Sequence, residues 1–181
     1  MERPFSAPGP GSTPTPPISA PASKTTTKSV RVVVRVRPPS PSELFEGDPV
    51  VSVEGDGRIV RVKRDAGSQL FEYDKVFDMY TRQSQVYSTI SSGIIEDLFK
   101  GISGCVLAYG QTGAGKTYTM MGANGKMGDG VMPKMLTDLY TEIERRKEEN
   151  PQLECSILMS FLEVYMDYVY DLLGDPTKHI N

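Results

Sequence analysis

The sequence has no tryptophan, two cysteines and one histidine among its 181 residues. Two cysteines without CxxC spacing do not support a disulfide framework, which favours an intracellular protein. Cys105 and Cys155 both lie in apolar runs, so we interpret them as buried, reduced thiols. His179 stands alone near the end of the sequence, and we interpret it as a solvated residue and not as a metal ligand.

Long apolar runs and an excess of one charge are also missing. No run reaches the roughly 18 apolar residues of a membrane span, and the N-terminus lacks the apolar core of a secretory signal. The 20 Lys and Arg residues nearly balance the 23 Asp and Glu residues, which leaves a net charge of −3. We therefore expect neither nucleic acid nor a membrane as a partner.

Residues 1–29 differ in composition from the rest. They hold seven prolines with many Ser, Thr and Ala residues. Such a segment buries too little apolar surface to offset the entropy of ordering it, so we expect a disordered extension before a domain at residues 30–181. It either carries phosphorylation sites or a short docking motif, or it is a plain solvated tail.

A phosphate-binding loop of the pattern G-x-x-x-x-G-K-T is the most informative motif. It comprises Gly110, Gln111, Thr112, Gly113, Ala114, Gly115, Lys116 and Thr117. Glycines let several backbone N–H groups point at one anion, Lys116 can reach the β- and γ-phosphates, and the Thr117 hydroxyl can ligate Mg²⁺. The apolar residues 105–109 before it are typical of a buried strand, and a helix is expected from about 115 to 121. This context predicts a nucleotide site.

Strand and helix patterns alternate along residues 30–181. One helix is predicted at 83–100, with Thr81 as N-cap and Gly101 as C-cap, and another from about Pro133 to just before Asn150. Strands are predicted at 30–36, 50–53, 59–62, 71–77, 105–109, 153–165 and 168–173. This order indicates an α/β fold with a central sheet covered on both faces.

Several of these motifs together resemble the kinesin motor domain. Residues 108–120 are similar to the family's phosphate loop extended on both sides, and Arg35-Val36-Arg37-Pro38 is similar to its first-strand motif. Residues 163–165 and 168–173 resemble the strand pair that follows the second helix of kinesins. The resemblance covers about residues 29–175 and implies a three-layer P-loop NTPase with a mixed sheet.

The resemblance also implies a set of ligands, partners and site residues. ATP and Mg²⁺ would bind at residues 110–117, with Thr117 as the metal ligand. The base pocket would be formed by Arg35, Pro38, Tyr87 and Tyr118, although Tyr87 also lies on an apolar helix face, where core packing is the alternative. The implied activity is ATP-dependent movement on microtubules, in the cytoplasm and on the cytoskeleton.

The sequence departs from the family pattern in two ways. Met166-Asp167 stands where kinesins usually have Asn-Glu. Neither switch motif, Asn-x-x-Ser-Ser-Arg-Ser or Asp-Leu-Ala-Gly, occurs in the 181 residues. We therefore expect the N-terminal, nucleotide-binding half of a motor domain, without catalytic residues of its own and without the main microtubule-binding elements.

Two other functions compete with this interpretation. A truncated, non-motile nucleotide-binding or interaction protein would show the same loop. A small P-loop kinase is less favoured, because about 80 residues of expected order precede the loop. Glu163 follows an apolar run, but the resemblance places it away from the metal. The charged cluster at 142–149 is typical of a solvated helix face with pairs such as Glu142–Arg146, and a tubulin contact there is the less favoured alternative.

Overall fold

The computed structural model describes residues 30–123, 128–175 and 178–180. The disordered extension expected at residues 1–29 lies outside the described residues, as does part of the glycine-rich segment after the phosphate loop. The described residues combine strands and helices, so the α/β fold class is confirmed.

The strands in the described part of the chain form three sheets. Parallel pairing joins β1 (Val33–Arg35) to β5 (Lys75–Phe77), with Val34 opposite Val76. An antiparallel meander is formed by β2 (Val51–Glu54), β3 (Ile59–Arg64) and β4 (Gly67–Glu72). The third sheet, also antiparallel, contains β6 (Leu162–Tyr165), β7 (Tyr168–Asp171) and β8 (His179–Ile180).

The hairpin predicted around residues 54–57 is confirmed, with Val53 opposite Val60. The single strand predicted at 71–77 is wrong. The structure has β4 ending at Glu72 and β5 beginning at Lys75, and the two strands belong to different sheets. Tyr73 and Asp74 lie between the two strands, and the chain changes sheet there, so the segment predicted as one strand contains two.

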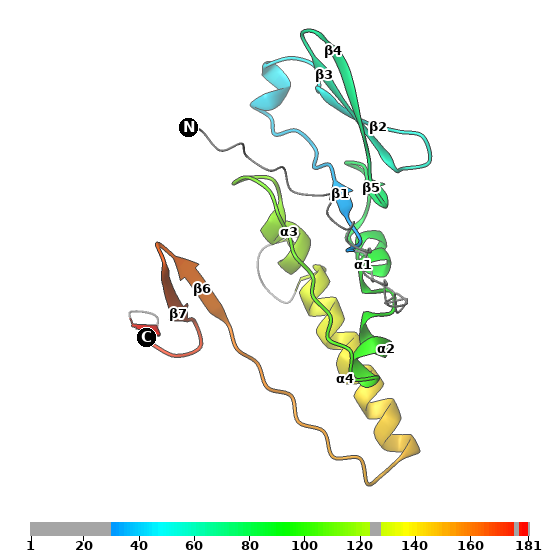
Figure 1. Cartoon of the computed structure of the whole chain (residues 1–181), viewed down its shortest axis with the longest axis vertical. Helices are drawn as coiled ribbons and strands as arrows, with labels where there is room; N and C mark the ends of the chain where they lie inside the picture. The colour runs from blue at the N-terminus through cyan, green and yellow to red at the C-terminus, as the bar shows by residue number, and fades with distance from the viewer. Residues whose placement is uncertain (1–29, 124–127, 176–177, 181) are drawn as a thin grey trace, which may run out of the picture. The chain divides into compact units, whose positions relative to one another are not determined.

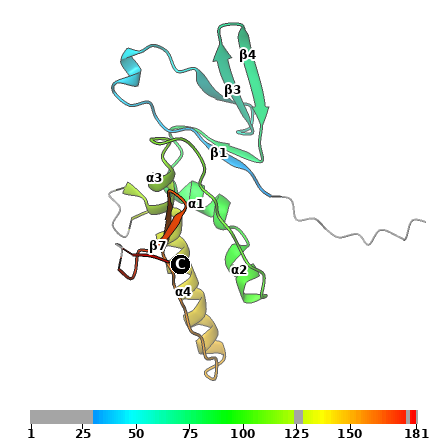
Figure 2. The ribbon, with the colours of Figure 1, turned by 60° about the vertical axis from the view of Figure 1, so that its left-hand side comes forward.

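The helices gather around the longest one, α4 (Val131–Glu149), as Figure 1 shows. It contacts α1 (Gln83–Ser91), α2 (Ile94–Phe99) and α3 (Lys116–Met121). A short 3-10 helix, η1 (Glu43–Phe45), lies between β1 and β2 in the chain. Figure 2 shows α3 and α1 beside α4 from a second direction. α4 ends before Asn150-Pro151 as predicted, because a proline makes the helical conformation unfavourable for the residue before it.

The single helix predicted at 83–100 is two helices. Gly93 has φ +82°, a left-handed conformation that separates α1 from α2. Thr81 is not the N-cap; Arg82 is, and its backbone N–H donates to Gln85 Oε1 at 3.0 Å. Gly101 follows the C-cap Lys100 with φ +79°, and the bonds Gly101 N to Leu98 O (3.0 Å) and Ile102 N to Asp97 O (2.9 Å) form a Schellman motif.

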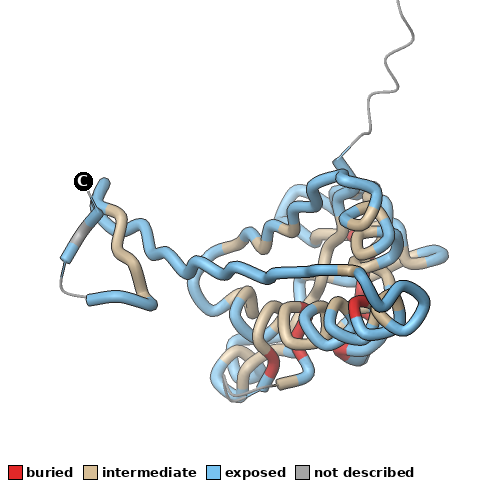
Figure 3. The backbone as a smooth tube through the Cα atoms, turned by 90° about the horizontal axis from the view of Figure 1, so that it is seen from below, coloured by how far each residue is buried: buried red, intermediate tan, exposed pale blue. Residues whose placement is uncertain are grey.

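Few of the described residues are buried, and Figure 3 shows them as short red segments of the tube. Among the described residues, the buried hydrophobic side chains are Val60, Val76, Phe77, Val86, Val131 and Ile143. No helix in the described part of the chain is long and apolar enough to cross a membrane.

Residues 105–109 are extended but unpaired, so the buried strand expected there is wrong. Leu107 is 84% exposed and Tyr109 96% exposed. A strand needs a hydrogen-bonded neighbour, and no described segment provides one. The same reason applies to residues 153–161, which are extended outside any sheet. Cys105 and Cys155 lie in these two segments and are exposed, so the expectation of buried thiols is also wrong.

Candidate nucleotide-binding site

The phosphate-binding loop leads from the extended residues 105–109 into α3. Gly113 (φ +80°) and Gly115 (φ +97°) have left-handed conformations, and Gly115 is the N-cap of α3. A side chain at either position would be strained, which explains the glycines of the motif. The Ala114 N–H donates to Gln111 O at 3.1 Å and closes a tight turn. The backbone therefore has the curl that an anion cradle requires.

Lys116 folds back over this loop. Its ammonium donates to Gly110 O at 2.8 Å and to Gln111 O at 3.0 Å. The cation is thus held at the loop itself, where phosphate oxygens would compete with these two carbonyls for its donors. Thr117 lies in the first turn of α3 and is exposed. These residues fit a magnesium–polyphosphate group.

A cavity of 380 Å³ adjoins the loop. This volume lies within the range of about 300–1,000 Å³ that is typical of small-molecule sites. Three of the four residues expected around a base line it, together with two loop residues and five others. The lining residues are Arg35, Pro38, Tyr118, Ala114, Gly115, Val36, Arg37, Met79, Thr81 and Thr119.

Arg35 is held in the wall of this cavity by a polar network. Its Nη1 donates to Gln83 Oε1 at 2.6 Å and to Thr119 Oγ1 at 3.0 Å. Its guanidinium carbon lies 5.1 Å from the centroid of the Tyr118 ring. Burial lowers the pKa of Arg35, but an arginine still carries its charge at neutral pH. The result is a flat, oriented cation beside an aromatic ring.

Sequence reasoning missed several residues at this site. Gln83 is 5% exposed, and its Nε2 donates to Tyr118 O at 2.6 Å, so it connects α1 to α3. Arg37 Nε donates to Gly113 O at 2.9 Å. The alternation of Arg35 and Arg37 could have indicated Arg37, because residues two apart in an extended segment point to one side. No sequence signal marks Gln83 or Thr119, which lie 48 and 84 positions from Arg35.

The structure does not bring Tyr87 to this cavity. Its hydroxyl donates to Asp138 on α4, and it lines a different cavity of 300 Å³ with Pro133 and Thr137. Burial, and then the Asp138 carboxylate, raises the pKa of Tyr87 to about 12. This position against α4 favours core packing, the alternative stated for Tyr87, over a place in the base pocket.

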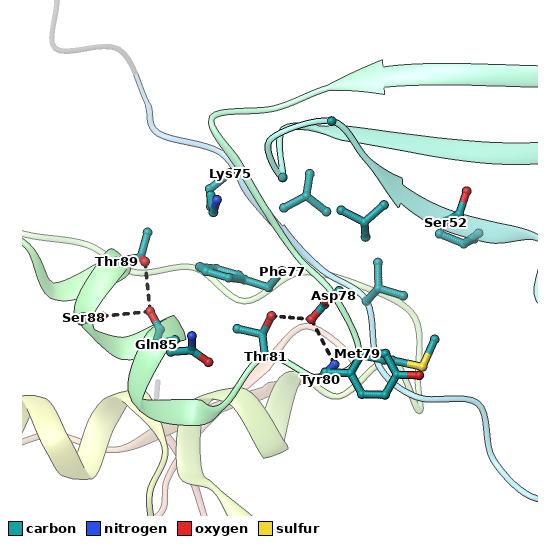
Figure 4. Close-up of a pocket in the computed structure, with 16 residues that line it drawn as sticks. Ser52, Lys75, Phe77, Asp78, Met79, Tyr80, Thr81, Gln85, Ser88 and Thr89 are labelled. Atoms are coloured by element: carbon teal, nitrogen blue, oxygen red, sulfur yellow. Dashed lines mark hydrogen bonds between the residues drawn. The ribbon is translucent and has the colours of Figure 1, made fainter.

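A larger cavity of 770 Å³ lies between the β2–β3–β4 sheet and the segment of β5 and α1 (Figure 4). Several of its polar groups already have hydrogen-bond partners. Asp78 Oδ1 accepts from Thr81 Oγ1 at 2.7 Å and from the Tyr80 N–H at 3.0 Å, and Lys75 Nζ donates to Asp56 O at 3.2 Å. No residue of the phosphate loop lines it, so the smaller cavity is the candidate site.

Comparison with known proteins identifies one family. The profile of the kinesin motor domain matches residues 35–181. A kinesin heavy chain of Neurospora crassa is 37% identical over 156 residues, which covers 84% of this chain and 16% of that protein. The human kinesin heavy chain isoform 5A is 36% identical over 155 residues, or 83% of this chain and 14% of that protein.

A solved kinesin structure is similar in fold as well as in sequence. It is described as "Structure of a fast kinesin: Implications for ATPase mechanism and interactions with microtubules". The TM-score is 0.68 and the identity 33%, over 83% of this chain and 42% of that one. The 181 residues thus span less than half of the solved chain and a smaller share of the heavy chains.

Proposed function

The chain belongs to the kinesin motor domain family, a family of microtubule motors, and on that premise we propose that residues 110–117 and the adjoining cavity bind ATP with Mg²⁺. One observation carries the proposal. Arg35, Pro38 and Tyr118 line the same cavity as the loop residues Ala114 and Gly115. A surface suited to a base therefore adjoins a cradle suited to phosphates.

Each residue has a distinct role in this proposal. The Lys116 ammonium neutralises phosphate charge, and the Thr117 hydroxyl ligates the metal. Pro38 provides an apolar contact and Arg35 a cation for the π-face of the base. Mg²⁺, when bound, offsets the charge of the phosphates. Gln83 and Thr119 keep the Arg35 guanidinium in place.

Movement on microtubules, in the cytoplasm and on the cytoskeleton, is the activity proposed for the kinesin that contains these residues. Phosphoryl transfer needs groups that position the attacking water and stabilise charge at the γ-phosphate. The 181 residues contain neither switch motif, so we expect them to bind ATP without efficient turnover by themselves. The same observation supports the second candidate, a non-motile nucleotide-binding protein. Family membership argues against the small kinase.

Equilibrium binding tests the proposal. A fluorescent ATP analogue is titrated with the 181-residue chain, with Mg²⁺ and with EDTA, and is then displaced with unlabelled ATP. We expect saturable, Mg²⁺-dependent binding that excess ATP reverses. Binding that ATP does not displace would contradict a nucleotide site. Co-sedimentation with microtubules and ATP turnover, measured in parallel on the same chain, test the second candidate: ATP turnover that microtubules stimulate would contradict a non-motile nucleotide-binding protein.

A further inference from the structure

Arg37 holds a peptide in the middle of the phosphate loop. Its Nε donates to Gly113 O at 2.9 Å, across 76 positions of sequence. The N–H on the other side of the same peptide, from Ala114, donates to Gln111 O. The peptide between Gly113 and Ala114 is therefore fixed at both its oxygen and its nitrogen. Its plane influences the direction of the neighbouring N–H groups that an anion would meet.

Glu43 in turn fixes the Arg37 guanidinium. Nη1 donates to Glu43 Oε2 at 2.7 Å and Nη2 to Glu43 Oε1 at 2.6 Å, which is a bidentate pair. The Ser40 backbone N–H also donates to Glu43 Oε2, at 2.7 Å. The bonds from Arg37 and Ser40 lower the pKa of Glu43 to about 2, so its carboxylate is charged at neutral pH. With Nη1 and Nη2 of Arg37 bonded to Glu43, Nε is the donor that faces Gly113 O.

Stability alone does not account for this arrangement. The side chains of Arg37 and Glu43 are 38% and 41% exposed, and exposed ion pairs contribute little to the free energy of unfolding. Directionality is what a bidentate pair adds, because two parallel bonds set the plane of the guanidinium. A lysine ammonium could not reproduce that plane.

We infer that Arg37 and Glu43 form a positioning pair that sets the affinity of the phosphate loop for polyphosphate. This inference rests on the proposed nucleotide site. Neither residue belongs to the G-x-x-x-x-G-K-T motif, and Glu43 reaches the loop only through Arg37. The pair acts on the phosphate part of a ligand, so its contribution does not depend on the base.

The test is a double-mutant cycle on the 181-residue chain. Glu43→Gln, Arg37→Lys and the double variant are compared with the parent for affinity toward MgATP and toward magnesium tripolyphosphate, by displacement of a fluorescent ATP analogue. Each single substitution should lower the affinity for both ligands by the same factor, about two- to fivefold. Glu43→Gln should add nothing once Arg37 is lysine, because it acts through that residue.

Glu46→Gln is the matched control. Glu46 follows η1 directly and is exposed. The Glu46→Gln variant loses the same charge as Glu43→Gln, and its affinities for MgATP and magnesium tripolyphosphate should equal those of the parent. The thermal unfolding midpoints of all variants should also stay close to that of the parent.

Three results would overturn the inference. Parent-like affinity in Glu43→Gln would show that the carboxylate has no such role. Weaker ATP binding with unchanged tripolyphosphate binding would show that Arg37 acts on the nucleoside. Additive losses of affinity in the double variant would show that Arg37 and Glu43 act independently of each other. If the parent itself bound no nucleotide, the proposed function would fail first, and the inference with it.

Discussion

At the scale of single residues, Gln83 uses both ends of its amide in the wall of the candidate site. Its Oε1 accepts from Arg35 and its Nε2 donates to Tyr118 O, each at 2.6 Å. Gln83→Leu removes both bonds, while Arg35 keeps Thr119 Oγ1 and Tyr118 O keeps the Gly122 N–H as partners. At about 0.5–1.5 kcal/mol for each lost bond, the free energy of unfolding should fall by about 1–3 kcal/mol. Urea denaturation followed by circular dichroism measures this.

Gln83→Glu provides the comparison. It keeps an acceptor for Arg35 but places an oxygen against Tyr118 O, so it should be less stable than the parent. Unfolding curves of the parent and the leucine variant that coincide would show that the amide bonds contribute nothing.

Lys116 is the residue on which phosphate binding should depend most. A hydrogen bond to a charged group contributes about 1.5–3 kcal/mol, so Lys116→Ala should weaken MgATP binding by about 10- to 150-fold. Lys63→Ala removes the same charge from an exposed position on β3 and should leave the affinity unchanged. Isothermal titration calorimetry measures both. Equal losses in the two variants would indicate a general charge effect in place of a local contact.

At the scale of elements, Gly93 produces the break between α1 and α2. Its φ of +82° is accessible to glycine at little cost, whereas this conformation destabilises an L-residue by about 1–2 kcal/mol. We expect Gly93→Ala to lower the free energy of unfolding by about that amount, and Gly93→Asn to cost less because asparagine tolerates this conformation. If Gly93→Ala and the parent had the same free energy of unfolding in urea, the left-handed conformation assigned to residue 93 would be contradicted.

The charged face of α4 makes a pH-dependent contribution. Glu142 accepts from Arg145 Nη2 and Arg146 Nε at 2.7 Å each, and these arginines lower the pKa of Glu142 from 4.5 to about 2. The folded-state pKa is depressed, so the stabilisation is present above pH 4.5 and is lost as the pH falls toward 2.

Helical circular dichroism between pH 5 and 2 tests this contribution. The parent should lose more ellipticity in that window than Glu142→Gln, and the difference should shrink in high salt. Parallel curves for the two proteins would show that the carboxylate contributes no pH-dependent stability to α4.

At the scale of the whole molecule, the described residues expose much apolar surface. Leu107, Tyr109 and Leu158 are 84%, 96% and 91% exposed, in extended segments without strand partners. Unpaired strands and apolar patches promote association. We expect the 181-residue chain to form oligomers at micromolar concentrations, as measured by analytical ultracentrifugation.

A charge in one of these segments should reduce that association. Leu158→Lys places a cation at an exposed position and should shift the distribution toward monomer without altering the helical content. A parent that sediments as a monomer at every concentration would contradict this account.

Local patterns predicted much of the fold, and the exceptions have physical causes. The phosphate loop, α3, the β2–β3 hairpin and the C-terminal end of α4 follow from glycine, proline and periodic apolar residues, which act over a few positions. The lack of a strand partner for residues 105–109 could not be predicted, because strand pairing depends on neighbours far away in sequence. The Arg35–Gln83–Thr119 network is unpredictable for the same reason.

The most direct test of the central proposal is photolabelling of the 181-residue chain with 8-azido-ATP and Mg²⁺, followed by peptide mass spectrometry. The account predicts label in peptides that contain residues 35–38 and 114–119, which line the smaller cavity, and excess MgATP should prevent it. Label that MgATP prevents but that falls only on residues lining the larger cavity alone, such as Val51, Ser52 and Val53, would contradict the assignment of the site.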